Sequence, residues 1–218
     1  MKNNRICVIF AGGPERGLPC IPVPAGAYLL CADSGLKLCS RLGLKPDLVL
    51  GDFDSLGAEP TALPHITAQP EKDDTDTMLA VRHALSEGFR DIRIYGAFGG
   101  RLDHTLANLQ TLEFLRQNGA SGMLIGAGDW ACLLPADETG RYVRQPDFTL
   151  SVFAWSGTCR GVCIRGTKYT LEQGELSRSF PLGVSNEITA EAAEVSCTEG
   201  VLLIAGSAAE LTCRNAEP

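Results

Sequence analysis

The spacing of hydrophobic and polar residues changes part-way along the chain and divides it into two regions. In the first 125 or so residues, short apolar runs alternate with segments whose apolar residues recur every three or four positions. Runs of the first kind are typical of buried strands, and segments of the second kind of amphipathic helices. The predicted strands are residues 6–10, 28–32, 48–50, 92–95 and 123–125, and the predicted helices are residues 36–42, 75–87 and 102–117. Strand and helix in alternation predict an α/β domain with a doubly wound, mainly parallel sheet.

After about residue 135, the apolar residues occur in short, β-branched or alternating runs separated by Gly, Ser, Asn and Pro. Runs of this kind, with no long helical period, predict a small all-β sandwich or barrel. Its expected strands are residues 149–154, 161–165, 169–171, 194–197 and 201–205. With the junction in the segment 134–140, we predict an α/β domain over residues 1–134 and a β domain over residues 135–218.

Composition narrows the class of protein. The chain has 218 residues, of which 44% are hydrophobic, and this is ordinary for a globular protein with a sizeable core. No apolar run approaches the roughly 18 residues of a membrane helix, and the start of the chain holds too few apolar residues for a signal peptide. Nine cysteines without a Cys-x-x-Cys pair argue against a secreted disulfide framework, so we expect a cytoplasmic protein. A formal net charge of −7 argues against nucleic acid as a partner.

The aspartates are concentrated in one part of the sequence. Nine of the twelve lie between Asp33 and Asp103, and most of these belong to four loops of the predicted α/β domain. The four loops are residues 31–35, 51–55, 72–76 and 99–104. If the sheet is parallel, these loops open on the edge where the strands end, which is where ligands bind in such folds.

Several ionised carboxylates in one cleft repel one another, so protons or cations must neutralise them. Asp52 and Asp54 are expected on the same side of an extended segment, and carboxylates together with substrate phosphates are the usual ligands of Mg²⁺. We therefore interpret this pair as magnesium ligands. Structural interpretations stay open: Asp33 with Ser34 as a helix cap, Asp52 and Asp54 as a polar turn, and the acidic residues of 73–76 as the start of a helix.

A glycine-rich segment, residues 96–100, follows the predicted strand 92–95 and leads into a helix. Backbone N–H groups in such a segment can approach a phosphate closely. Arg101 adds a planar pair of donors suited to phosphate oxygens. His104 and Asn108 are four residues apart and share a helix face, and His104 has an equally simple explanation as a hydrogen-bonded structural residue.

Taken together and in order, these segments resemble the bacterial form of the thiamine pyrophosphokinase family. The resemblance rests on four ordered motifs within about 75 residues: Ala-Asp-Ser-Gly at 32–35, Pro-Asp-Leu-Val-Leu-Gly-Asp-Phe-Asp-Ser at 46–55, Glu-Lys-Asp-x-Thr-Asp at 71–76 and Gly-Gly-Arg-x-Asp-His-x-x-Ala-Asn at 99–108. It continues more weakly in Gly-Thr-Lys-Tyr-x-Leu at 166–171 and Val-Ser-Asn-Glu at 184–187.

The resemblance implies an enzyme, a thiamine diphosphokinase, that transfers a pyrophosphoryl group from ATP to the hydroxyl of thiamine with Mg²⁺ and releases AMP. The implied catalytic residues are Asp52, Asp54, Asp76, Arg101 and Asp103, of which Asp52, Asp54 and Asp76 would hold the metal. The implied ATP-binding residues are Asp33, Ser34, Lys72, Asp73, Gly99, Gly100, His104 and Asn108. The implied thiamine-binding residues are Tyr169, Ser185 and Asn186, in a pocket that such enzymes build at a homodimer interface. Many members have Trp in place of Tyr169, and an aromatic surface is kept here.

Elementary chemistry agrees with this interpretation. Phosphoryl-type transfer to a hydroxyl is catalysed mainly by positioning and by cations, so a pocket of aspartates needs no covalent nucleophile. Asp76 or Asp103 would take the proton of the hydroxyl, and the sequence leaves both open. Two other functions also stay open. One is a related magnesium pyrophosphotransferase with a different hydroxyl acceptor, and the other is a sensor that binds nucleotide or thiamine without turnover.

Overall fold

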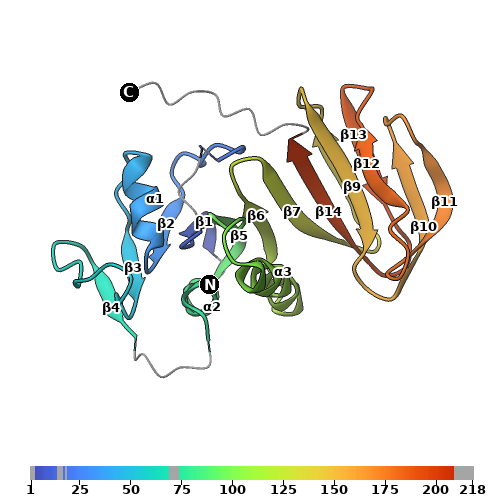
Figure 1. Cartoon of the computed structure of the whole chain (residues 1–218). Helices are drawn as coiled ribbons and strands as arrows, with labels where there is room; N and C mark the ends of the chain where they lie inside the picture. Colours follow the sequence, from blue (N-terminus) through green and yellow to red (C-terminus); the bar gives the residue numbers. More distant parts are fainter. Residues whose placement is uncertain (1–2, 14–16, 18, 69–73, 209–218) are drawn as a thin grey trace. The chain divides into compact units, whose positions relative to one another are not determined.

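The structure is a computed structural model that describes residues 3–13, 17, 19–68 and 74–208 (Figure 1). The chain divides between Ala127 and Gly128 into two compact units. This division lies ahead of the junction expected after residue 134, because Asp129–Pro135 forms a strand, β7, of the second unit. β7 pairs antiparallel along its whole length with the last strand, β14 (Val201–Ala208).

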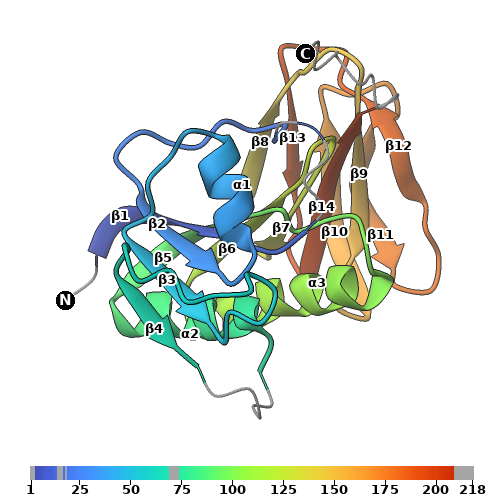
Figure 2. The same cartoon turned by 60° about the vertical axis from the view of Figure 1, so that its left-hand side comes forward.

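The first unit is built on a parallel sheet with helices on both faces. Its strands are β1 (Asn3–Phe10), β2 (Tyr28–Ala32), β3 (Leu48–Gly51), β4 (His65–Thr67), β5 (Phe89–Tyr95) and β6 (Ser121–Ile125), and its helices are α1 (Gly35–Arg41), α2 (Asp76–Ser86) and α3 (Leu102–Gln117). The strands stand in the order β6-β5-β1-β2-β3-β4, and every neighbouring pair is parallel. Figure 2 shows α1 on one face of this sheet and α2 and α3 on the other. The predicted α/β architecture is confirmed.

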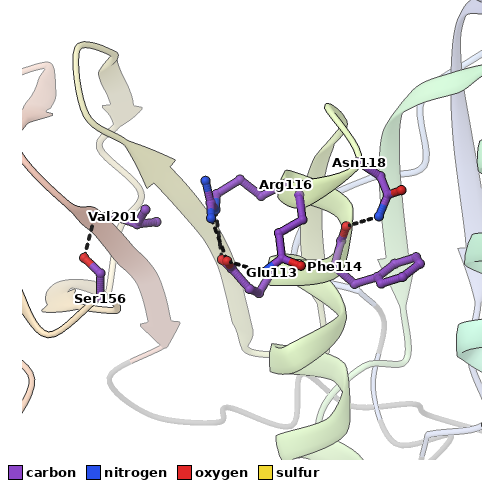
Figure 3. A network of polar contacts seen from close by, with 7 residues as sticks. Glu113, Phe114, Arg116, Asn118, Ser156 and Val201 are labelled. Carbon is purple, nitrogen blue, oxygen red and sulfur yellow. Dashed lines mark hydrogen bonds and ion pairs between the residues drawn. The ribbon is translucent and has the colours of Figure 1, made fainter.

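Local chemistry explains where the helices begin and end. Thr75 caps α2, since its hydroxyl accepts a hydrogen bond from the N–H of Met78 at 3.2 Å. At the end of α3, the side chain of Asn118 donates to the carbonyl of Phe114 at 2.8 Å, and Gly119 adopts a positive φ of 68° (Figure 3). A glycine of this conformation terminates a helix at little steric cost. The start of α2 and the end of α3 match the helical segments predicted from the sequence.

The core of the first unit lies on the central strands. Many side chains of β1, β2, β5 and β6 are completely buried. They include Ile9, Phe10, Leu30, Ile92, Ile94, Tyr95, Leu124 and Ile125. The chain leaves β1 to build β2, β3 and β4 on one side, and then returns to build β5 and β6 on the other. The reversal places the ends of β1 and β5 at a switch point, which is where open α/β sheets bind ligands.

Over its described residues, 128–208, the second unit contains antiparallel strands only. They are β7, β8 (Thr139–Val143), β9 (Phe148–Ala154), β10 (Thr158–Arg165), β11 (Leu171–Ser177), β12 (Gly183–Glu187), β13 (Ala192–Ser196) and β14. Within this unit, β12-β9-β14-β7 form one layer and β11-β10-β13-β8 the other. Trp130 of β7 stacks on Tyr142 of β8 with ring centroids 5.5 Å apart, which joins the two layers through their apolar faces. The predicted small antiparallel β domain is confirmed.

The β9–β10 turn is tied to the last strand by a side chain. Ser156 accepts a hydrogen bond from the N–H of Val201 at 2.9 Å through its hydroxyl oxygen (Figure 3). The carbonyl of Val201 in turn accepts from the thiol of Cys159 at 3.1 Å.

No helix in the described part of the chain is long and apolar enough to cross a bilayer.

Candidate active site

Close backbone contacts bring together the loops that follow β1, β2, β3 and β5. Gly13 lies against Gly96, because a Cβ atom at Gly13 would stand 2.0 Å from the carbonyl oxygen of Gly96. A Cβ atom at Gly12 would stand 2.2 Å from the hydroxyl of Ser34. At Gly13 a side chain would meet fixed backbone, so glycine is required there, whereas at Gly12 it would meet only the hydroxyl of Ser34, which can turn away. These contacts place the loops together as a floor at the carboxyl edge of the sheet, as the sequence predicts.

Three carboxylates gather on this floor. Asp33, from the loop after β2, and Asp52 and Asp54, from the loop after β3, each offer an oxygen atom within 4.8 Å of the other two. Asp33 is buried, Asp52 is half-buried and Asp54 is exposed. Three negative charges at this separation repel unless a cation joins them, and carboxylate oxygen is the ligand type that Mg²⁺ prefers.

Asp33 is held in an unusual backbone conformation. Its φ is +45°, which a non-glycine residue seldom adopts, and its N–H donates to the carbonyl of Leu50 at 2.8 Å. The side chain is 4% exposed, and its Oδ1 atom is the one buried side-chain oxygen or nitrogen without a hydrogen-bond partner among the described residues. Ser34 occupies the N-cap of α1 without a side-chain hydrogen bond. Capping therefore does not explain this acidic segment.

Asp52 and Asp54 come together through a turn and not through the extended segment that the sequence analysis expects. Phe53 between them has a φ of +61° and is buried at 3% exposure, with its ring edge-on to His65 at 5.8 Å. The N–H of Asp54 donates to Oδ1 of Asp52 at 3.3 Å. Burial of the phenyl ring thus pulls Phe53 inward, and both neighbouring carboxylates stay on the side that faces Asp33.

Of the acidic loop 72–76, the structure describes Asp74 and Asp76, which lie at the start of α2. Asp76 is the first residue of this helix, where a carboxylate is favoured by the helix dipole. It does not belong to the group of three carboxylates found among the described residues. Asp74 forms an ion pair with Arg82 at 2.7 Å. Lys72 and Asp73 lie outside the described residues.

The glycine segment after β5 has the conformation of a loop that exposes its backbone. Gly96, Gly99 and Gly100 all have positive φ values, of 71°, 86° and 69°. Arg101 follows as the N-cap of α3 and donates to both carboxylate oxygens of Asp103, with the Nε–Oδ1 distance at 3.1 Å. Hydrogen bonding by Arg101 lowers the pKa of Asp103 and raises that of Arg101. Both side chains are exposed, so the guanidinium group remains accessible to an anion.

Asn108 has a structural contact that the sequence does not reveal. It is 8% exposed, and its side-chain nitrogen donates to the carbonyl of Ala97 at 2.8 Å, which ties α3 to the glycine segment. His104 is exposed, and its backbone N–H donates to Asp103 at 3.0 Å. The ATP-binding role of these two residues stays a prediction.

The three residues predicted to bind thiamine lie on neighbouring segments of the second unit. Tyr169 is 65% exposed, and its backbone is hydrogen-bonded to the side chain of Asn186 in β12. Ser185 is exposed and has a φ of +57°, and its N–H donates to the hydroxyl of Ser151 at 3.1 Å. An exposed aromatic ring beside a strained, exposed serine is typical of a binding surface.

Comparison with known proteins matches both units. The family model described as "Thiamin pyrophosphokinase, catalytic domain" matches residues 24–123, and "Thiamin pyrophosphokinase, vitamin B1 binding domain" matches residues 141–202. A thiamine pyrophosphokinase of Bacillus subtilis is 28% identical over 204 residues, which cover 90% of this chain and 95% of that protein.

Solved structures agree with the sequence comparison. The crystal structure of a thiamine pyrophosphokinase from Bacillus subtilis has a TM-score of 0.83 at 26% identity and covers 94% of this chain and 99% of its own. A thiamin pyrophosphokinase family protein from Enterococcus faecalis has a TM-score of 0.79 at 30% identity, with the same coverage of 94% and 99%. With both its catalytic and its vitamin B1-binding domain present, this chain belongs to the thiamin pyrophosphokinase family.

Proposed function

We propose that the chain transfers a pyrophosphoryl group from ATP to the hydroxyl of thiamine, that AMP leaves, and that the aspartate loops of the first unit bind the magnesium nucleotide. The observation that carries this assignment is the meeting of Asp33, Asp52 and Asp54 in the catalytic domain, at the sheet edge where α/β proteins bind ligands.

The donor set fits a magnesium ion. All three groups are hard oxygen ligands, and the buried Oδ1 atom of Asp33 lacks a partner that a cation would supply. In our proposal Asp52 and Asp54 are ligands from this group, and Asp76 at the start of α2 is a further one. When bound, Mg²⁺ would neutralise part of the charge on the phosphate oxygens and so favour attack of the thiamine hydroxyl on the β-phosphorus of ATP, from which AMP leaves.

The glycine segment and its neighbours bind the phosphates of ATP in this proposal. Gly99 and Gly100 leave the backbone N–H groups open to approach, and Arg101 presents its guanidinium group directly beside them. Ser34, His104 and the undescribed Lys72 and Asp73 complete the predicted nucleotide site. Asn108 contributes by holding the carbonyl of Ala97 and therefore the start of the segment.

The proton of the thiamine hydroxyl needs an acceptor, and the sequence leaves Asp76 and Asp103 as candidates. Arg101 lowers the pKa of Asp103, which makes this carboxylate a weaker base than an unpaired one. Both residues stay candidates in this proposal. Asp103 also holds the guanidinium group of Arg101 in place through the two hydrogen bonds described above.

We propose that thiamine contacts the second unit at Tyr169 and Ser185, and that the protein is a homodimer. Thiamine is a cation, and an aromatic face in a protein of net charge −7 attracts cations. Several apolar side chains near Tyr169 in sequence are exposed, namely Phe180, Leu182 and Val184. Exposed groups of this size favour an interface with a second copy. The eight described cysteines are all free thiols, which supports a reducing, cytoplasmic location.

The experiment is to incubate the purified protein with ATP, thiamine and MgCl₂ and to separate the products by chromatography. We expect AMP and thiamine diphosphate in equal amounts, with no product after addition of EDTA. ADP and thiamine monophosphate would instead show transfer of one phosphoryl group and would contradict the proposal. Turnover with a different hydroxyl compound, and none with thiamine, would show that the second unit selects another acceptor.

A further inference from the structure

Asn186 is one of the few polar residues that the second unit buries, at 6% exposure. Both polar atoms of its side-chain amide bond to the backbone of Tyr169: Nδ2 donates to the carbonyl of Tyr169 at 2.7 Å, and Oδ1 accepts from the N–H of Tyr169 at 3.0 Å. Oδ1 also accepts from the N–H of Glu187 at 3.0 Å. Both lone pairs of the amide oxygen are therefore used, which leaves the side chain one spare donor hydrogen.

Thr167 also forms a hydrogen bond with the backbone of Tyr169. It is 5% exposed, and its hydroxyl donates to the carbonyl of Tyr169 at 3.0 Å. The turn itself is paired to β12 and its continuation, because the N–H of Lys168 donates to the carbonyl of Glu187 at 2.9 Å. The backbone of Tyr169 thus has both of its polar groups bonded to buried side chains, while the residue as a whole is 65% exposed.

The exposed ring already attracts one cation, because the Nζ atom of Lys168 lies over it at 5.7 Å from the ring centroid. Ordering a surface aromatic residue loses conformational entropy, and burying two polar side chains to do so consumes hydrogen-bonding groups. When a residue is already ordered before the ligand arrives, binding costs none of its conformational entropy, so a ligand that stacks on the ring binds more tightly. A flat cationic ring system is the ligand that gains most from a fixed phenol face.

We propose that Asn186 and Thr167 are positioning residues that fix Tyr169 as a pre-ordered stacking surface, and that Asn186 acts on thiamine binding through Tyr169 and not by direct contact. The inference rests on the proposed function, because it takes thiamine as the ligand of Tyr169. It changes the role that the resemblance implies for Asn186.

A double-mutant cycle tests whether Asn186 acts through Tyr169. We expect Asn186→Ala to raise the KM for thiamine by about 10-fold, which is the usual size of an indirect effect on a binding group, and to leave the KM for ATP unchanged. In a Tyr169→Ala background, the same replacement should change the KM for thiamine by less than about twofold, because the residue it positions is gone. Equal effects of Asn186→Ala in both backgrounds would show direct contact and overturn the proposal.

Two further variants keep the test informative if Asn186→Ala folds poorly. Thr167→Val keeps the shape of the side chain but loses the hydroxyl that donates to the carbonyl of Tyr169, so we expect a smaller rise in the KM for thiamine. Thr189→Ala is the matched control. The exposed hydroxyl of Thr189 donates to the carbonyl of Gly166 in the same turn at 3.5 Å and not to Tyr169. The KM values of this variant should therefore equal those of the unmodified protein.

Amide hydrogen exchange separates this inference from the proposed function, because it needs no substrate. The N–H of Tyr169 should exchange at least about tenfold faster in Asn186→Ala than in the unmodified protein, since its acceptor is lost. Unchanged exchange would overturn the positioning role. Faster exchange together with an unchanged KM for thiamine in Tyr169→Ala would support the positioning role and overturn the thiamine assignment.

Discussion

Gly51 and Asp33 approach each other so closely that no side chain fits between them. A Cβ atom at Gly51 would stand 2.9 Å from the Cβ atom of Asp33 and 3.1 Å from its Cα atom. Gly51 ends β3 and Asp33 directly follows β2, its parallel neighbour, and the contact holds Asp33 beside the loop that carries Asp52 and Asp54. The carboxylate cluster therefore depends on a residue without a side chain at position 51.

Replacement of Gly51 by alanine should disturb this cluster. The added methyl group displaces the backbone of Asp33, and overpacking of this kind costs about 1–3 kcal/mol of unfolding free energy. We expect the Mg²⁺ concentration for half-maximal activity to rise by about 10-fold, as is usual when the support of a metal ligand is lost. Gly157→Ala is the control, because a Cβ atom there meets nothing within 4 Å. Equal Mg²⁺ dependence in the two variants would contradict the prediction.

Asp52→Asn and Asp54→Asn should each lower kcat by about 10²-fold or more, the usual cost of removing one group that stabilises charge in the transition state. Loss of activity should not reflect unfolding. With one charge fewer, the cluster repels itself less, so the melting temperature without Mg²⁺ should be equal or higher. Asp91→Asn is the control, since its exposed carboxylate only faces Arg93 at 3.8 Å. Steady-state kinetics and thermal melts measure both effects, and full activity in either site variant would refute the metal assignment.

Asn108→Ala should weaken ATP binding and stability together. The change leaves the buried carbonyl of Ala97 without its donor, which costs about 1–3 kcal/mol. Because this carbonyl belongs to the glycine segment, we expect the KM for ATP to rise while the KM for thiamine stays constant. Asn118→Ala provides a matched comparison: it removes a similar hydrogen bond at 2.8 Å from the exposed end of the same helix. If both variants had the same KM for ATP, Asn108 would have no effect on the nucleotide site.

The pair Arg101–Asp103 predicts a pH dependence. A carboxyl group whose pKa is lowered by folding contributes stability above its unfolded pKa, near about 3.9 for Asp, and loses that contribution as the pH falls through the lower folded value. The pair should therefore stay ionised from neutral pH down to about 4. An NMR titration of the Asp103 carboxyl carbon should give a midpoint below the ordinary value. The midpoint should return toward that value in Arg101→Gln, and in high salt because both side chains are exposed. A midpoint unaffected by Arg101→Gln would show that the ion pair does not form in solution.

Much of the fold follows from local patterns. Apolar runs such as residues 92–95 and 28–32 are recognisable because parallel strands are buried on both faces. The strands that the sequence analysis missed have weaker patterns. β4 has three residues, β8, β11 and β12 are largely exposed, and β7 includes a proline at its end. The strand predicted at residues 169–171 overlaps β11 only at Leu171, because residues 169 and 170 belong to the turn before it. Their place in a sheet depends on partners distant in the chain, which no local pattern specifies.

The candidate site was likewise predictable from local patterns only in part. The aspartate motifs and glycine segments identify the chemistry, because carboxylates and flexible backbone at strand ends have few other uses in combination. Which carboxylates meet was decided by tertiary contacts: Asp33 joins Asp52 and Asp54, held by Gly51 and by the inward-facing ring of Phe53. Hydrogen bonds across the fold likewise decided that Asn108 bonds to Ala97, and Asn186 to Tyr169.

The amino-acid sequence by itself determined the order of strands and helices in the first unit apart from β4, the family and the set of reactive side chains, because these depend on residue type and spacing. The tertiary structure alone decided which of those side chains face one another and which are occupied in holding the backbone. An asparagine offers the same donor and acceptor wherever it lies, and only the residue that packs against it determines whether it binds a ligand or supports one that does.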